Sequence, residues 1–144
     1  MSMTKSPQRL LVFGANGMLG NAVLRWFSND PGYEVTGTVR RMESARGLQE
    51  LAPKASFVEG VDGTDLAATR RLFAEVRPDA VINCAGVVKQ LAGADMPAVA
   101  IPINALLPHR LARLAQDHGA RLVHISTDCV FSGARGNYSE EDTP

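Results

Sequence analysis

The chain has 144 residues with 15 basic and 15 acidic side chains, so its formal net charge is zero. That balance argues against a broad surface for nucleic acid or membrane, and the apolar runs are far too short to span a bilayer. Its two cysteines lie far apart in the sequence, and neither belongs to a metal-binding or redox motif. We therefore expect a cytoplasmic protein without a metal site. The length fits one domain, and we expect a flexible, polar N-terminus at residues 1–8 and a folded domain at residues 9–144.

Apolar runs alternate along the chain with amphipathic segments. The runs predict strands at residues 9–13, 33–39, 55–60, 80–84 and 121–126. The amphipathic segments predict helices at residues 17–29, 64–76 and 98–118, with a short one near 44–51. Pro102 and Pro108 interrupt the last helix, which we expect to begin near Ile103 or to be kinked. Such alternation is typical of βαβ crossovers and predicts an α/β fold, a Rossmann-like doubly wound parallel sheet with helices on both faces.

Three glycines, Gly14, Gly17 and Gly20, follow the first predicted strand and open the first predicted helix. Gly14 would allow a tight turn, Gly17 would let the backbone approach a phosphate, and Gly20 would let the helix pack closely on the strand. The amides and the positive dipole end of the helix would then face an anion. The pattern predicts a site for the pyrophosphate of a dinucleotide. We expect the side chains of Met18 and Leu19 to pack the helix while their backbone contacts the phosphates.

The end of the second predicted strand bears on the choice of dinucleotide. An acidic residue there usually binds the ribose 2′-hydroxyl of NAD, whereas an arginine suits the 2′-phosphate of NADP. This strand runs without a carboxylate into Arg40 and Arg41, either a solvated strand end or a pair of phosphate ligands. After the glycine turn, the second interpretation favours NADP, with NAD as the alternative. Asp62, after the third strand, either accepts from the adenine amino group or is a turn residue before the next helix.

Two further strand ends carry candidate site residues. The fourth predicted strand ends in small residues that either leave room for a cofactor or allow close helix packing: Cys84, Ala85 and Gly86. The fifth strand runs into the hydroxyl pair Ser126 and Thr127. A hydroxyl at this sheet edge can hydrogen-bond a substrate carbonyl and stabilise charge on its oxygen, or it can satisfy local backbone groups.

Together these motifs resemble those of the extended short-chain dehydrogenases/reductases, most closely the dTDP-4-dehydrorhamnose reductase-like branch. The glycine motif at 14–20 is similar to theirs, as are Asn-Cys-Ala-Gly at 83–86 and Asn-Ala at 104–105. Residues 126–131, Ser-Thr-Asp-Cys-Val-Phe, resemble the signature Ser-Thr-Asp-Tyr-Val-Phe of that branch and depart from it at Cys129. A stretch similar to its Tyr-x-Glu-x-Asp follows at residues 138–142, so the resemblance runs from about residue 9 to the end.

The resemblance implies that NADPH delivers a hydride to the 4-keto group of a nucleotide-linked deoxysugar, and that Thr127 hydrogen-bonds the substrate carbonyl. From the motifs and the resemblance together, the expected cofactor-binding residues are Gly14, Asn16, Gly17, Met18, Leu19, Arg40, Arg41, Asp62, Cys84, Ala85, Gly86, Asn104, Ile125 and Ser126. The expected partner is a nucleotide-sugar substrate, with neither nucleic acid nor membrane. Family members often dimerise, so a homodimer is a further expectation.

The proton donor of the family and its partner form a Tyr-x-x-x-Lys pair, which this sequence does not contain. We therefore expect the N-terminal portion of a larger NAD(P)-dependent oxidoreductase, with a sheet incomplete at its C-terminus and no activity on its own. One alternative is a sugar-nucleotide epimerase or dehydratase. Another is a non-catalytic, dinucleotide-binding regulatory subunit, since the β subunit of methionine adenosyltransferase resembles the same branch. A purely structural α/β domain would bind no nucleotide.

Overall fold

The computed structural model describes residues 6–88 and 96–143. It contains a five-stranded sheet in the order β3-β2-β1-β4-β5, and every neighbouring pair is parallel. The strands are β1 (Gln8–Phe13), β2 (Tyr33–Val39), β3 (Ser56–Glu59), β4 (Ala80–Asn83) and β5 (Arg121–His124). The strand order reverses direction at β1, between β2 and β4. The doubly wound parallel sheet predicted from the sequence is therefore confirmed.

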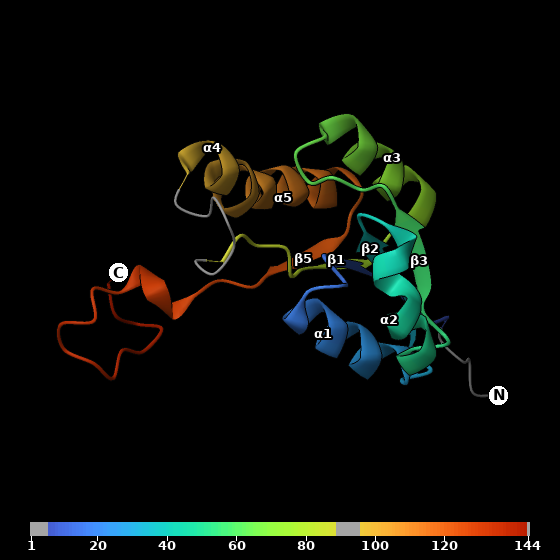
Figure 1. The fold of residues 1–144 in the computed structure, drawn as a ribbon, viewed down its shortest axis with the longest axis horizontal. Coiled ribbons are helices and arrows are strands. Elements are labelled where there is room, and N and C mark those ends of the chain that lie inside the picture. Colours follow the sequence, from blue (N-terminus) through green and yellow to red (C-terminus); the bar gives the residue numbers. More distant parts are fainter. Residues whose placement is uncertain (1–5, 89–95, 144) are drawn as a thin grey trace.

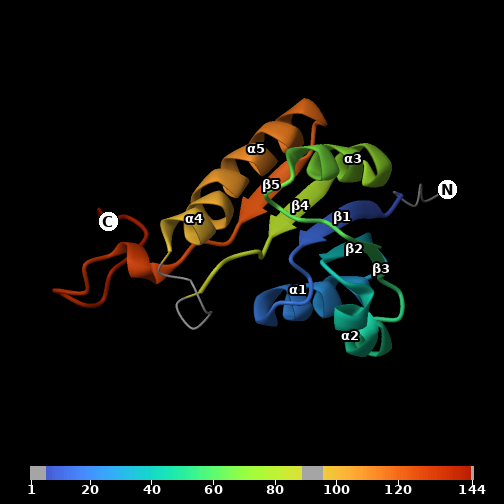
Figure 2. The same ribbon diagram turned by 45° about the horizontal axis from the view of Figure 1, so that its top comes forward.

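Helices cover both faces of the sheet, as Figures 1 and 2 show. One layer holds α1 (Met18–Ser28) and α2 (Arg46–Leu51), which follows the 3₁₀ turn η1 (Met42–Ala45). The other layer holds α3 (Leu66–Val76), α4 (Pro97–Ala100) and α5 (Leu107–Asp117). A last 3₁₀ turn, η3 (Asp128–Val130), follows β5. In the described part of the chain, no helix is long and apolar enough to cross a membrane.

The central strand β1 supplies both halves of the core because its side chains alternate between the two faces. Leu11 and Phe13 pack in a cluster with side chains of α3 and α5, and Leu10 and Val12 pack in a second cluster with side chains of α1 and α2. All four are at most 3 % exposed. Such a strand reads as a continuous apolar run, which is why the sequence identified it readily. β1 begins at Gln8, one residue before the predicted start, and residues 1–5 of the expected flexible N-terminus lie outside the described residues.

The last helical segment differs from its prediction. Helical turns begin at Pro97, so the expected start near Ile103 is wrong, and a π-helical segment, η2 (Ile101–Leu106), joins α4 to α5. A proline lacks an amide hydrogen and crowds the carbonyl four residues earlier. Pro97, Pro102 and Pro108 each lie in the first two positions of their own segment, where a donor is least needed. The prolines thus divide the helix into segments with different turns and do not end it.

Candidate functional site

The turn between β1 and α1 requires glycine at two of its three glycine positions. Gly14 has a φ of +82°, and a Cβ there would lie 3.0 Å from the Cα of Ala85. A Cβ on Gly20 would lie 2.1 Å from the carbonyl oxygen of Gly14, a distance that no backbone tolerates. A Cβ on Gly17 would meet that same oxygen at 3.4 Å. The predicted roles of Gly14 in the tight turn and of Gly20 in close helix packing match this geometry.

The N-terminus of α1 lies open at the carboxyl edge of the sheet. Gly17 is its N-cap residue, without a side-chain cap, and the first turn holds no acidic residue. The amides of that turn have no acceptor inside the helix, so together with the helix dipole they form a site suited to an anion. Asn16 is exposed, and so are Met18 and Leu19 at 94 % and 42 %. The expectation that Met18 and Leu19 pack the helix is therefore wrong, because the core-facing side of α1 runs through Gly20 and later residues.

Sequence reasoning missed Thr38, which holds the glycine turn onto β2. Its hydroxyl oxygen accepts a hydrogen bond from the amide of Gly14 at 2.9 Å. Its carbonyl oxygen accepts another from the amide of Ala15 at 3.1 Å. The signal in the sequence was a threonine one residue before the end of the predicted strand 33–39, and it needed the parallel pairing of β1 with β2 to become specific.

The exit of β4 packs against the same turn. Cys84 donates its amide to the carbonyl oxygen of Phe13 at 2.9 Å, and Ala85 lies against Gly14 as described above. Burial raises the pKa of the Cys84 thiol to about 11, so this thiol is uncharged at neutral pH. Close packing therefore accounts for the small Ala85 side chain, and its contact with a cofactor stays a prediction.

The buried side chain of Asn83 links the ends of β4 and β5. Its Oδ1 accepts from the amide of Ala85 at 3.1 Å, which orients the amide group and turns Nδ2 toward Nδ1 of His124, also at 3.1 Å. Nδ2 can only donate, so Nδ1 of His124 is the acceptor in this bond. The amide of Ile125 then bonds the carbonyl oxygen of Asn83 at 3.3 Å, which continues the pairing just beyond β5. The two strand exits form one ordered edge.

Asn104 lies across this edge on η2. Its side-chain oxygen accepts from the amide of Val87 at 2.8 Å, and its side-chain nitrogen donates to the carbonyl oxygen of Val87 at 2.9 Å. A Cβ on Gly86 would lie 3.7 Å from that same side-chain oxygen. Asn104 therefore positions the segment after β4, and its direct contact with a cofactor stays a prediction.

Arg40 and Asp62 approach each other from the ends of β2 and β3. The carboxylate of Asp62 accepts from both the amide and the hydroxyl of Thr64 at 2.8 Å. These hydrogen bonds, and to a smaller extent the charge of Arg40, lower the pKa of Asp62. The geometry is that of the turn residue anticipated before α3, and a role toward adenine stays a prediction. The guanidinium-bearing residues Arg40 and Arg41 are exposed near this edge.

The segment after β5 carries the hydroxyl pair. Ser126 and Thr127 are exposed, and the hydroxyl oxygen of Thr127 accepts from the amide of Cys129 at 3.1 Å. This bond fits the local backbone role left open by the sequence. A hydrogen bond from Thr127 to a substrate carbonyl stays a prediction.

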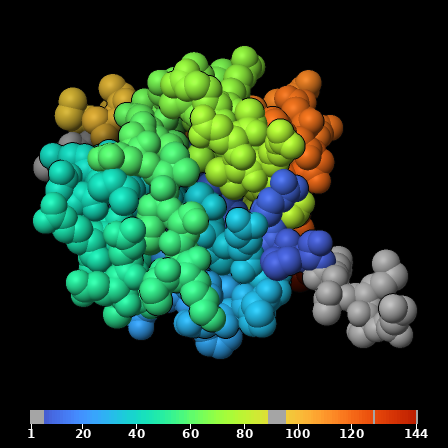
Figure 3. All heavy atoms as spheres, turned by 90° about the vertical axis from the view of Figure 1, so that its right-hand side faces the viewer, coloured from blue at the N-terminus to red at the C-terminus, as the bar shows by residue number. Residues whose placement is uncertain are grey.

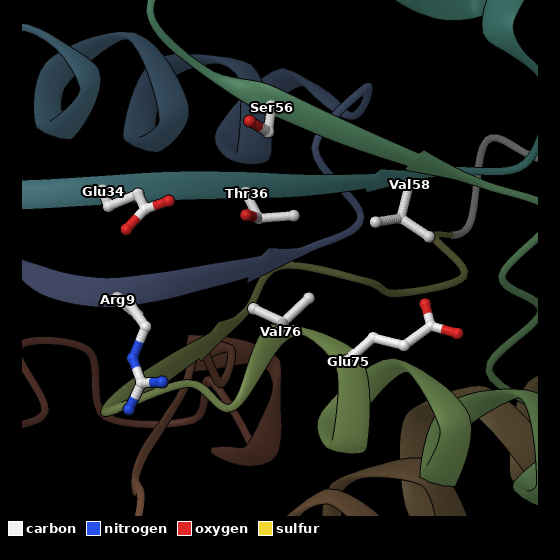
Figure 4. A pocket seen from close by; sticks show the side chains of 7 residues that line it. All are labelled: Arg9, Glu34, Thr36, Ser56, Val58, Glu75 and Val76. Carbon is white, nitrogen blue, oxygen red and sulfur yellow. The ribbon is translucent and has the colours of Figure 1, made fainter.

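Two hollows of the described surface lie away from this edge, around the beginning of β1. One has a volume of about 260 Å³ and is lined by residues of β1, β2 and β3 and of the end of α3: Arg9, Glu34, Thr36, Ser56, Val58, Glu75 and Val76 (Figures 3 and 4). Its arginine is already paired with the carboxylate of Asp79 at 3.0 Å. Within residues 6–88 and 96–143, no three His, Cys, Asp or Glu side chains gather as metal ligands. The candidate site is therefore the open carboxyl edge and not these hollows.

A parallel sheet with a glycine turn at the point where its strand order reverses defines a Rossmann-like domain, a class that binds ligands at the carboxyl edge. The family model described as the RmlD substrate binding domain matches residues 8–144, and the chain belongs to this family.

Relatives and solved structures agree with this assignment. The chain is 35 % identical to dTDP-4-dehydrorhamnose reductase of Streptomyces griseus over 94 % of its own length and 38 % of that protein. It is 31 % identical to methionine adenosyltransferase 2 subunit beta of Rattus norvegicus, over 95 % of this chain and 37 % of that one. The structure of dTDP-4-dehydrorhamnose reductase from Bacillus anthracis in complex with NADP matches with a TM-score of 0.71 and 28 % identity, covering 92 % of this chain and 41 % of that one. The chain thus spans less than half the length of these relatives.

Proposed function

We propose that this chain is the dinucleotide-binding part of an NAD(P)-dependent oxidoreductase that acts on a nucleotide-linked sugar. The observation that carries the proposal is the glycine turn, in which sterically required glycines lead into an uncapped helix N-terminus at the carboxyl edge of the sheet. The similar reductase of Bacillus anthracis was solved with NADP. We expect NADP in preference to NAD, because Arg40 and Arg41 lie exposed where a 2′-phosphate would be selected.

When bound, a reduced nicotinamide supplies a hydride to the keto carbon of the substrate, whose oxygen then takes a proton. In the proposed reaction, the residues of this chain bind the cofactor and orient the substrate. The first-turn amides of α1 would hold the pyrophosphate, the arginine pair would hold the 2′-phosphate, and the hydroxyl of Thr127 would donate a hydrogen bond to the keto oxygen without giving up its proton. We propose the 4-keto group of a nucleotide-linked deoxysugar as the substrate, and a cytoplasmic location.

The first test is calorimetric titration of the 144-residue chain with NADPH and with NADH. We expect NADPH to bind more tightly, and the exchange of Arg40 and Arg41 for Ala to weaken NADPH binding about tenfold or more while NADH binding changes little. Arg70→Ala, an exposed arginine on α3, is the matched control for loss of a positive charge. A folded chain that binds neither dinucleotide would contradict the site itself. Equal binding of both would contradict only the preference for NADP.

A non-catalytic regulatory subunit is the second candidate, favoured by the similarity to methionine adenosyltransferase 2 subunit beta. A longer protein that carries this chain separates the two candidates. Oxidation of NADPH that depends on a nucleotide-linked keto sugar supports the reductase. Dinucleotide binding without any such oxidation supports the regulatory subunit.

A further inference from the structure

Thr38 makes two consecutive hydrogen bonds to the glycine turn from a single position on β2. Its side chain is 2 % exposed, its hydroxyl oxygen binds the amide of Gly14, and its carbonyl oxygen binds the amide of Ala15. A β-branched side chain has few χ1 rotamers, so the hydroxyl is held in place. The turn is therefore fixed to β2 as well as to its own strand, β1.

These bonds decide which amides of the turn remain for a ligand. Gly14 and Ala15 donate to Thr38, and the amide of Gly17 donates to the carbonyl oxygen of Gly14 at 3.2 Å. The remaining exposed residues of the turn and first helical turn are Asn16, Met18 and Leu19. The first hydrogen bond of the α1 backbone is the one that the amide of Asn21, three residues beyond Met18, donates to the carbonyl oxygen of Gly17.

We propose that Thr38 is a positioning residue of the dinucleotide site: it withdraws the Gly14 and Ala15 amides from the ligand and presents those of Asn16, Met18 and Leu19 to the pyrophosphate. This proposal rests on the proposed dinucleotide-binding function. Thr38 lies near the end of β2, two residues before Arg40, which follows that strand directly, so the bonds also fix the spacing between the pyrophosphate and 2′-phosphate sites. A pyrophosphate is common to both nicotinamide dinucleotides, so Thr38 acts on NADPH and NADH alike, whereas the arginine pair acts on NADPH.

The variant Thr38→Val keeps the shape of the side chain and removes the acceptor, which leaves the part-buried Gly14 amide without its partner. We expect this variant to bind both dinucleotides about tenfold more weakly. Thr38→Ser keeps the hydroxyl and restores binding. Thr36→Val, two residues earlier on the same strand and lining the hollow of about 260 Å³, leaves binding unchanged. Calorimetry on the four 144-residue chains measures these affinities, with circular dichroism as the check of folding.

Amide NMR spectra of the unchanged chain supply the second measurement, which needs no variant. On addition of NADPH, we expect the largest shifts at Asn16, Met18 and Leu19, and slow hydrogen exchange at Gly14 before and after. A folded Thr38→Val chain with undiminished affinity overturns this proposal while the dinucleotide site stands. If that variant does not fold, shifts centred on Gly14 and Ala15 overturn it instead. An unchanged chain that binds neither dinucleotide overturns the proposed function, and this proposal with it.

Discussion

Gly20 has the least room of the glycines in the turn. A methyl group at this position would lie 2.1 Å from the carbonyl oxygen of Gly14 and 2.9 Å from the Cα of Ala15. Both obstacles are backbone, so no side-chain rotation can relieve the contact. We expect Gly20→Ala to lower the free energy of unfolding by about 3 kcal/mol or more, since α1 must move away from β1.

The control is Gly47→Ala in α2, where a Cβ would meet nothing within 4 Å. An alanine in that helix should raise the free energy of unfolding by about 0.5–1 kcal/mol. Urea denaturation at 25 °C followed by circular dichroism measures both changes. Equal stability of Gly20→Ala and the unchanged chain would mean that α1 does not lie against the turn as described.

At the scale of single residues, the role of a residue could be predicted from the sequence only where it depends on the neighbouring residues of the chain. Gly14 was predictable because a positive φ in a turn is a property of the chain around it. Thr38 was not, because its role depends on the pairing of Leu11 and Val12 with Thr36 and Gly37 on a strand more than twenty residues away. The exposure of Met18 could not be foreseen either, since an apolar side chain in a helix is usually assigned to the core.

At the scale of elements, the start of α5 shows how one helix is fixed to the sheet. Leu107 is fully buried in the core cluster of Leu11 and Phe13, and a Cβ on Gly63 would lie only 2.7 Å from its Cδ2. The preceding Leu106 is 41 % exposed. The loop after β3 and the helix α5 therefore meet at one side chain, with glycine at the point of contact.

We expect Leu107→Ala to lower the free energy of unfolding by about 2–5 kcal/mol, because it removes fully buried methyl groups and leaves a cavity. Leu106→Ala, the same exchange one residue earlier, should cost about 1 kcal/mol or less. Parallel urea titrations of the two variants measure the difference. Similar losses for both would show that α5 is rotated relative to the arrangement described.

The sequence placed every strand and the three main helices within a few residues, because their apolar periodicity reflects burial directly. It did not predict the π-helical segment η2, since the prolines at 102 and 108 fit a break, a kink or a wider turn equally well. It also began the third helix at Thr64, whereas Asp65 caps α3 through bonds to the amides of Ala67 and Ala68. Helix ends are set by which side chain captures the free amides, and for α3 that side chain is Asp65.

At the scale of the whole molecule, the central strands β1 and β4 are better protected from solvent than β5. β1 and β4 pair with strands on both sides, whereas β5, within the described residues, pairs with β4 alone. Val123 on β5 is 39 % exposed and Ile125 just after it is 40 % exposed, although both are apolar. The core clusters contain four side chains of β1, and they take in Leu122 of β5 only at the margin.

Local opening should therefore begin at β5 and reach β1 only with global unfolding. Two matched pairs of amides test this. At the start of the β1–β4 pairing, the backbone amide of Asp79 donates to the carbonyl oxygen of Arg9 at 2.8 Å. At the start of the β4–β5 pairing, the backbone amide of Arg121 donates to the carbonyl oxygen of Asp79 at 3.0 Å. At the other end of these pairings, the amide of Cys84 donates to β1 and the amide of Ile125 donates to β4. In hydrogen exchange at low protein concentration, we expect Asp79 and Cys84 to be protected about tenfold or more beyond Arg121 and Ile125. Equal protection within both pairs would show that β5 opens only together with the central strands, so that the sheet of this chain unfolds as one unit.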